Sequence, residues 1–324
     1  MRRLRRNFRK NRNKIILTTA FALVFCLCVG YAAFQTTINF NIKGNIKKKT
    51  FTPRDLAKNV VTTGDGLYAD TTEDGRYIYR GANPNNYIKL GSDMYRIISV
   101  ESDNTLKVIK NGSIGKKVFD PGYETVIDGV TSANSNLGTR YSSTSTDYCY
   151  VDNPTEYYGC NSWGSKATTL DSNGNNVTQM PREVGGTLYN LPEKEAYLNT
   201  YLNNDWYSSL SSNVQNIVVS HMFNVGGVKD DETNLSNTIS QEATYKWRGK
   251  VGLMNPSDYV KASTNSACDS VSSYFGNSSC FGRNEVTHNW MSVEPTSGWN
   301  SWTIAPYCSR FLRFRCDSSS LSIL

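Results

Sequence analysis

The sequence predicts an α+β protein in which one N-terminal transmembrane helix precedes a loop-rich domain pinned by disulfides. Three features of the 324-residue chain carry this prediction. They are an uncharged apolar run near the start, short strand-like runs around two helical stripes, and six cysteines in local pairs beyond the apolar run. The predicted segments are a basic cytoplasmic stretch at 1–14, a membrane anchor or signal peptide at 15–34, a stalk at 35–50, a strand- and loop-rich part at 51–190 and a C-terminal part at 191–324.

The N-terminus has the charge pattern of a membrane anchor. Residues 1–14 carry eight Arg and Lys and no acid, and residues 15–34 carry no charged side chain. A helix of this length spans a hydrocarbon core of about 30 Å and bonds its own backbone groups, which lipid cannot do. Because basic residues stay on the cytoplasmic side, we expect a single-pass protein of the cell membrane with an extracellular domain. The alternative is a cleaved signal peptide, which the small residues Gly30, Ala32 and Ala33 also fit.

The basic character of the chain belongs to this first segment. The formal net charge is +7, and because residues 1–14 contribute +8, the rest of the chain carries −1. A nucleic-acid partner is therefore not indicated. The exported part is rich in Asn, Ser, Thr, Gly and Tyr, a composition that suits an extracellular surface with many hydrogen-bonding and aromatic groups.

Cysteine usage agrees with export. The cysteines beyond the anchor fall into three local pairs, which are Cys149 with Cys160, Cys268 with Cys280, and Cys308 with Cys316. Sequential pairing is the prediction, because each loop is compact and polar, although six cysteines allow fifteen connectivities. The spacing does not favour a metal site, since neither CxxC nor HxxxH occurs and the chain has only two histidines. We expect no cofactor and no metal.

Strand-like runs dominate the first part of the domain. The alternation of apolar and polar residues predicts strands at 76–80, 87–90, 94–101 and 105–110. The last two flank Ser102, Asp103 and Asn104, which are turn-forming residues and predict a hairpin. Residues 111–190 are rich in Gly, Ser, Thr and Asn and predict loops.

Two helices are predicted in the middle of the chain. Asn190 and Glu193 predict a capped start with proline in the first turn. Leucine and tryptophan recur every four residues over 198–210, which is one stripe of a helix. A second stripe runs over 214–222 and contains His221, which predicts a histidine packed in the core. A short strand at 250–254, a helical turn at 257–263 and terminal strands at 302–304 and 311–316 complete the prediction.

The stalk contains one more strand-like run. In Thr36–Ile42, apolar Ile38, Phe40 and Ile42 alternate with polar residues. This run beside the anchor favours a structural surface or fibre protein as an alternative function.

Several short motifs carry a resemblance to a known family. They are Gly81–Ile88, Tyr95–Glu101, Tyr158–Gly164, Gly249–Asn255, His288–Met291 and Trp302–Pro306. Together they resemble uncharacterised surface proteins of Gram-positive bacteria that have an N-terminal membrane anchor. The ectodomains of those proteins look similar to the C-type-lectin-like fold, which formylglycine-generating enzymes also use. Relatives continue past this point with a closing strand, so the resemblance leaves open whether the C-terminal part is truncated or closes differently.

Candidate ligand-binding residues lie near the C-terminus. Trp299 follows Ser297 and Gly298 and is the tryptophan expected to be exposed, whereas Trp290 and Trp302 are expected in the core. The remaining candidates are Tyr307, Ser309, Arg310, Phe311 and Arg313. In C-type-lectin-like proteins diversified by retroelements the variable residues lie in this last segment, so the resemblance implies a binding surface here.

The predicted function is a membrane-anchored extracellular module that binds a protein or a glycan and is not an enzyme. A Cys280–His288 nucleophile pair is conceivable, but a bridged Cys280 removes it, and no phosphate loop, dinucleotide fingerprint or nucleophile elbow occurs. The alternatives are a structural surface or fibre protein, a retroelement-diversified binding protein and an enzyme of the formylglycine-generating type. Asp171–Asn175 is interpreted as a plain turn, because the downstream acid of a calcium loop is missing.

Overall fold

The computed structural model describes most of the chain beyond Phe51. The described residues are 52–112, 114, 116–117, 119–120, 126–127, 130–131, 144–149, 162–181, 184–229, 231–276, 280, 285–292, 307–308 and 319–320. The chain divides into two units, Met1–Thr50 and Phe51–Leu324. The predicted anchor and stalk belong to the first unit and lie outside the described residues. A search of the described residues finds no helix that is long and apolar enough to cross a membrane.

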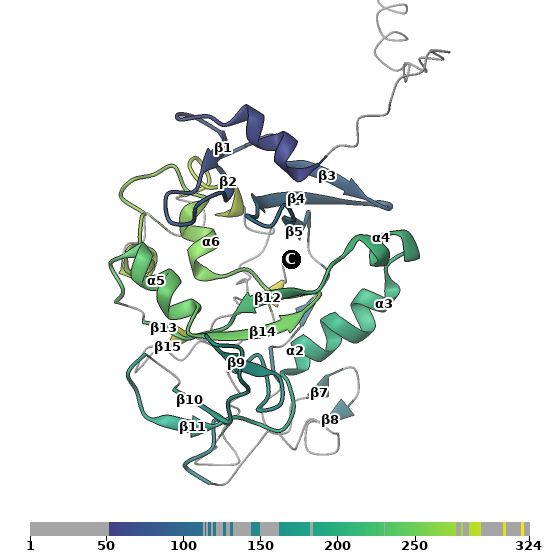
Figure 1. Cartoon of the computed structure of the whole chain (residues 1–324), viewed down its shortest axis with the longest axis vertical. Coiled ribbons are helices and arrows are strands. Elements are labelled where there is room, and N and C mark those ends of the chain that lie inside the picture. The colour runs from purple at the N-terminus through teal and green to yellow at the C-terminus, as the bar shows by residue number, and fades with distance from the viewer. Residues whose placement is uncertain are drawn as a thin grey trace, which may run out of the picture. The chain divides into compact units, whose positions relative to one another are not determined.

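Short strands outnumber helices in the described part of the chain (Figure 1). The strands are β1 (Gly66–Ala69), β2 (Tyr77–Arg80), β3 (Tyr87–Leu90), β4 (Asp93–Val100), β5 (Leu106–Lys110), β6 (Lys116–Lys117), β7 (Val126–Ile127), β8 (Val130–Thr131), β9 (Thr169–Asp171), β10 (Gln179–Pro181), β11 (Leu188–Asn190), β12 (His221–Asn224), β13 (Val228–Lys229), β14 (Tyr245–Gly249), β15 (Tyr307–Cys308) and β16 (Ser319–Ser320). The helices are η1 (Pro53–Asn59), α2 (Tyr197–Thr200), the π-helix η4 (Tyr201–Trp206), α3 (Tyr207–Ser209), α4 (Ser212–Ile217), α5 (Leu235–Glu242), α6 (Pro256–Lys261), α7 (Val271–Gly276) and η7 (Trp290–Ser292).

The first five strands form one antiparallel sheet. Its order is β1-β2-β4-β3, and β5 pairs with β4 along the other side. The hairpin predicted between β4 and β5 is confirmed: Asn104 takes φ of 68°, and the Asp103 carboxylate accepts hydrogen bonds from the amide and hydroxyl of Thr105. A short polar side chain tolerates the left-handed conformation that this turn requires.

Apolar side chains fill both faces of this sheet. On one face Leu67, Tyr79, Ile97 and Val100 form a buried cluster. On the other face Ile98 and Ile109 pack with Ala262 and Trp290, which come from the far end of the described chain. A register shift between Ile97 and Ser99 interrupts strict alternation along β4, so Ile97 and Val100 share one face while Ile98 lies on the other.

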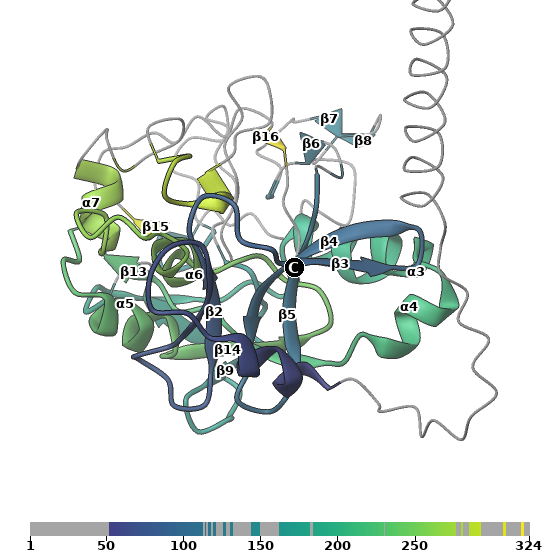
Figure 2. The same ribbon diagram turned by 90° about the horizontal axis from the view of Figure 1, so that it is seen from above.

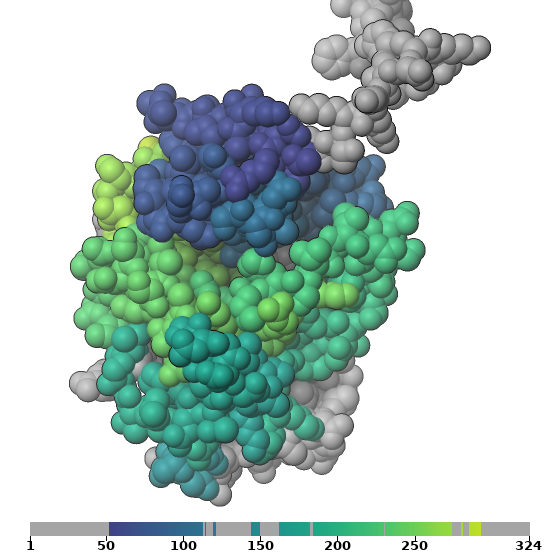
Figure 3. All heavy atoms as spheres, viewed as in Figure 1, coloured from purple at the N-terminus to yellow at the C-terminus, as the bar shows by residue number. Residues whose placement is uncertain are grey.

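The second sheet has the order β12-β14-β9 and carries the largest apolar cluster. Trp247 of β14 contacts the rings of Trp163 and Phe223, with centroids 5.7 Å apart in each pair. Its indole N–H donates to the Glu195 carboxylate at 2.7 Å, so the buried ring has a polar partner. Figures 1 and 3 show residues 52–112, in purple and blue, packed as one block on the green segments that contain this sheet.

The helix predicted over 198–210 forms, but it begins later than expected. The first helical residue is Tyr197, and Asn190 ends strand β11 rather than capping the helix. Leu198 and Leu202 are fully buried, as the four-residue spacing predicts. The middle of the helix is a π-helix, and Asn203 within it donates from its amide to the Val251 carbonyl at 2.9 Å and accepts from the Val251 amide at 3.1 Å.

The second predicted helix is wrong beyond Ile217. Helix α4 ends there, and His221 begins strand β12 with its side chain exposed, not packed in a core. The residues 217–223 contain valine, isoleucine and phenylalanine, whose β-branched or aromatic side chains fit a strand as well as a helical stripe. Pairing of Phe223 with Trp247 of β14 decided the outcome in favour of a strand.

The strand predicted at 250–254 is also wrong. The strand is β14, which ends at Gly249, and residues 251–254 follow as buried irregular backbone. The helical turn predicted at 257–263 is confirmed by α6, which ends at Lys261. The predicted terminal strands at 302–304 and 311–316 lie outside the described residues.

A buried ion network joins the first sheet to α6. Arg76, the residue before β2, donates to Asp70 at 3.0 Å, to Glu101 at 3.1 Å and to Asp258 at 3.0 Å. Asp258, on α6, also accepts from Lys107 of β5. Lys261 reaches back to Asp70 at 2.8 Å, so three cations and three carboxylates alternate across the joint. The network therefore fixes α6 against the sheet.

Candidate functional site

The strand that carries one candidate ligand-binding residue lies beside β13. Tyr307 and Cys308 form β15, which pairs in parallel with Val228 and Lys229. The views in Figures 1 and 2 agree that β15 lies on the side of α5 and α6. The other candidates lie outside the described residues, and they are Trp299, Ser309, Arg310, Phe311 and Arg313.

A buried apolar cluster lies beneath this pair of strands. Val228 of β13 is fully buried and packs with Val260 of α6, Val271 of α7 and the two cysteines Cys268 and Cys280. The three valines come from three different short elements and the cysteines from the loops beside α7, so the cluster joins segments that bury little apolar surface alone. The cluster holds β13 in place and thereby positions the strand that pairs with it.

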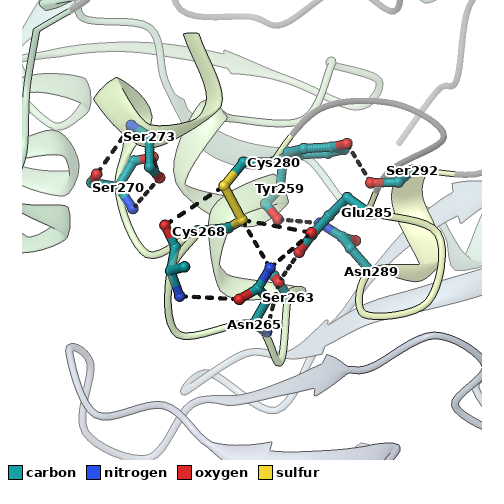
Figure 4. The surroundings of a disulfide bond; sticks show 11 residues. Tyr259, Ser263, Asn265, Cys268, Ser270, Ser273, Cys280, Glu285, Asn289 and Ser292 are labelled. Carbon is teal, nitrogen blue, oxygen red and sulfur yellow. Dashed lines mark hydrogen bonds between the residues drawn. A yellow bond between two sulfur atoms is a disulfide. The ribbon is translucent and has the colours of Figure 1, made fainter. Parts of the chain in front are cut away.

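A disulfide closes the cluster. Cys268 and Cys280 are bonded, with their Cα atoms 5.4 Å apart, which is the sequential pairing that the sequence predicts for these two (Figure 4). Both cysteines are fully buried. Cys149 is also disulfide-bonded, and its predicted partner Cys160 lies outside the described residues, as do Cys316 and the side chain of Cys308.

Glu285 ties the disulfide loop to the segment that follows it. Its carboxylate is fully buried and accepts hydrogen bonds from the Ser263 hydroxyl and, at 3.2 Å, from the Asn265 amide. The same Asn265 amide points at the Cys268 sulfur, 3.1 Å away, and Figure 4 shows these groups gathered around the bridge. A buried carboxylate is tolerated when its oxygens are satisfied in this way.

The segment after Glu285 is hydrogen-bonded to the first sheet. The Trp290 amide donates to the Gly81 carbonyl at 2.7 Å, and its indole N–H donates to the Tyr79 carbonyl at 3.0 Å. The guanidinium of Arg96 lies 4.3 Å from the ring centroid of Trp290 and 4.6 Å from that of Tyr87, which gives cation–π contact with both. Trp290 is buried, as expected for a core tryptophan.

The placed residues Ser292 and Tyr307 flank the stretch that contains Trp299, and the remaining candidates after Tyr307 follow β15. Residue 292 leaves a short helix that is bonded to the first sheet, and residue 307 enters a strand on the disulfide cluster. Loops held by a rigid base are where proteins concentrate binding residues. The structure thus places Ser292 and β15 and assigns no ligand to them.

The described residues offer little acid–base or nucleophilic chemistry here. Cys280 is bridged and buried, so it presents no thiolate to His288, which is exposed. No group of three metal-binding side chains gathers within the described part of the chain. The Asp171 carboxylate accepts from the amides of Asn173 and Asn175 and is used inside its own turn, as a plain turn requires.

The chain matches no protein-family model, no curated protein and no solved structure. The C-type-lectin-like resemblance therefore stays a prediction. The arrangement of the disulfide, Glu285 and the strand pair is described from this chain alone.

Sequence reasoning missed Glu285 and its partners. Glu285 is one acid within a polar stretch, and Ser263 and Asn265 lie 22 and 20 residues before it. No periodic pattern links positions at such separations in a loop. The neighbouring cysteine pair was the nearest usable signal, because it brings 268 and 280 together.

The disulfide allows a direct stability prediction. Changing Cys268→Ser and Cys280→Ser together is expected to lower the free energy of unfolding by about 2–3 kcal/mol, the scale for a loop of this length. The measurement is urea unfolding of the full chain followed by tryptophan fluorescence. An exposed double change, Ser266→Ala with Thr287→Ala, serves as the comparison for altered hydroxyls in the same region. A double-cysteine variant as stable as the parent would contradict the assignment of the bridge as a stabilising link.

Proposed function

We propose that the protein is a membrane-anchored extracellular module that binds a protein or glycan ligand through its C-terminal segment, without catalysis. One observation supports the site above others: β15, which carries Tyr307, pairs with β13 on the disulfide-closed cluster. Trp299 lies between two placed residues, Ser292 and Tyr307, and Arg310 follows β15 by two residues, so both candidates adjoin positions that the structure fixes, and fixed neighbours reduce the conformational freedom lost on binding.

The residue types in the segment suit recognition. Tryptophan, tyrosine and arginine are enriched among residues that dominate binding energy, and aromatic rings stack on sugar faces and apolar side chains. Trp299 and Arg310 are the two candidates expected to contribute most. The exported part carries almost no net charge, so we expect contacts by hydrogen bonding and aromatic packing more than by long-range attraction.

A binding screen tests the proposal. The full chain, purified in detergent micelles under oxidising conditions, is probed against arrays of cell-surface glycans and proteins. The double variant Trp299→Ala, Arg310→Ala is expected to weaken the strongest interaction by at least about 30-fold, because two central residues each worth about 1–2 kcal/mol are removed. Unchanged affinity in a folded double variant would contradict the proposed site.

A matched control separates the site from general surface effects. Leu188 and Lys194 are exposed and lie in or beside β11, away from β15 in the chain. Leu188→Ala with Lys194→Ala removes one apolar and one cationic side chain, much as the test variant does. We expect this pair to leave binding unchanged.

The competing function is an enzyme of the formylglycine-generating type. Such an enzyme requires free and accessible cysteines. Cys268 and Cys280 are bridged and buried in this structure, which disfavours that role for these two. Titration of thiols in the folded, oxidised protein distinguishes the functions. The binding module predicts no accessible thiol beyond the anchor, whereas the enzyme predicts two.

A further inference from the structure

Strand β3 is an open border of the first sheet. Among the described residues it pairs only with β4, at the end of the strand order. The Ile97 amide donates to the Asn86 carbonyl, so Asn86 points toward β4, and alternation in an antiparallel ladder then directs the backbone groups of Tyr87 and Lys89 away from it. These two residues present unpaired N–H and C=O groups along the edge, which is a template for another strand.

An apolar surface surrounds this edge. Tyr87 is 48% exposed and Met94, on β4, is 41% exposed. The tip of their hairpin packs against α4, because a Cβ on Gly91 would lie 3.0 Å from Val214. Ile217 and Val219, at the end of α4, are 58% and 54% exposed. Figures 1 and 2 both place the tip of the β3–β4 hairpin beside α4.

Two further border strands differ from β3: β1 is covered, and β5, which pairs with β4 alone among the described residues, carries none of the exposed large apolar residues. Val60, at the end of η1, forms a parallel bridge to Leu67 of β1. Four of the six most exposed large apolar residues, Tyr87, Met94, Ile217 and Val219, lie on the β3–β4 hairpin or next to α4. Concentration of apolar groups at an open edge distinguishes β3 from both β1 and β5 within the described residues and marks a surface for strand addition.

The sequence contains a segment with the matching pattern. Residues 36–42 alternate apolar Ile38, Phe40 and Ile42 with polar residues, so as a strand they present one apolar and one polar face. The segment belongs to the unit Met1–Thr50, which is separate from the unit that carries β3.

We propose that residues 36–42 of one copy add as a strand to the β3 edge of a neighbouring copy, with the apolar face on Tyr87 and Met94. Each copy has one such segment and one such edge, and these are different surfaces. The contact is consequently head-to-tail, and contacts of this kind generate rings or open chains rather than closed dimers. This inference concerns assembly and does not rest on the proposed ligand binding.

Proline at position 89 tests the edge. The Lys89 N–H faces outward, so Lys89→Pro removes a donor from the open edge and leaves the hydrogen bonds to β4 in place. Lys89→Ala is the matched control, because it removes the same charge and keeps the N–H. The full chain in detergent micelles is followed by sedimentation over a concentration series and by hydrogen exchange at Tyr87 and Lys89.

Paired charges test the added strand. Phe40→Asp places a charge on the apolar face, and Asn41→Asp places the same charge on the polar face one residue away. Both positions lie outside the domain of β3, so the folded state of that domain is not at risk. We expect association of the parent, Lys89→Ala and Asn41→Asp at the same concentration.

Association that needs at least about tenfold more protein in both Lys89→Pro and Phe40→Asp is the supporting result, together with slower exchange of the Tyr87 and Lys89 amides at high concentration. A monomer at every concentration would overturn the proposal, as would association indifferent to both changes. Protection that is independent of concentration yet lost in Phe40→Asp would also overturn it, since the strand would then come from the same chain.

Discussion

Asp258→Asn is expected to lower the free energy of unfolding by about 3–5 kcal/mol, the largest effect of any change considered for this chain. The side chain is buried and accepts from Arg76 and Lys107. Although burial alone raises the pKa of Asp258, Lys107 and Arg76 hold it well below its ordinary value. Asparagine keeps the shape of the side chain and removes the charge, which leaves the buried Arg76 and the partly buried Lys107 facing a neutral amide.

Urea unfolding of the full chain measures this cost, and the exposed pair Lys166–Glu193 supplies the control. Glu193→Gln removes one carboxylate from a solvated ion pair and is expected to change stability by less than about 1 kcal/mol. The sheet and α6 meet through the Asp258 network, so a loss in Asp258→Asn no larger than in Glu193→Gln would show that other contacts carry the joint.

Glu242 is expected to make the protein less stable as the pH rises from 4.5 to 7. Burial raises the pKa of Glu242 to about 7, and the nearby Asp258 adds to the rise. Two hydrogen bonds from Ser257 act in the opposite direction, because they favour the charged form. The unfolded chain releases this proton near its ordinary pKa of 4.5, whereas the folded chain holds it to about 7. The folded state therefore binds more protons across this window, and its stability falls with pH.

The size of this effect follows from the shift. Each pKa unit corresponds to about 1.4 kcal/mol, so the loss between pH 4.5 and pH 8 is roughly 3–4 kcal/mol. Asp258 is charged in this window in the folded state, and its own contribution is lost only as the pH falls below its unfolded pKa of 3.8. We therefore expect maximal stability in weakly acidic solution, with losses on both sides.

The variant Glu242→Gln tests whether the titration of Glu242 causes the decline in stability. Glutamine keeps an oxygen acceptor for Ser257 and does not titrate, so the variant is expected to lose the decline between pH 4.5 and pH 8 and to exceed the parent in stability at pH 8. Glu193→Gln, at an exposed carboxylate, is expected to leave the decline intact. Parallel pH profiles for the parent and Glu242→Gln would show that Glu242 is solvated in the folded protein.

The sequence predicts the local parts of this fold well. The hairpin around Asn104 and the strands beside it depend on neighbours within a few residues, and turn chemistry reports them. The boundary between α4 and β12 was wrong because the residues there suit either element, and partners on β14 made the choice. A local sequence pattern identifies a helix or a strand only where the same residues would not suit the other element.

The candidate site divides in the same way. Cys268 and Cys280 are separated by 12 residues, and their pairing was predictable from compact spacing. Arg76 and Asp258 are separated by 182 residues, and neither carries a local sign of burial or pairing. Glu242 has the same difficulty, because a fully buried acid in a polar helix looks like a solvated one until Ser257 is placed beside it.

The bond from Trp290 to Tyr79 has a consequence for the order of folding. It joins residues 211 positions apart, and a parallel bridge joins Gly81 to Asn289 beside it. The hairpins of the first sheet form from near neighbours, but they are locked only when residues 289 and 290 arrive, and closing so long a loop is slow. During synthesis, which starts at the N-terminus, the first sheet stays partly uncovered until almost the whole domain has been made. We expect a slow folding phase that ends as Trp290 becomes buried, or folding that depends on a chaperone.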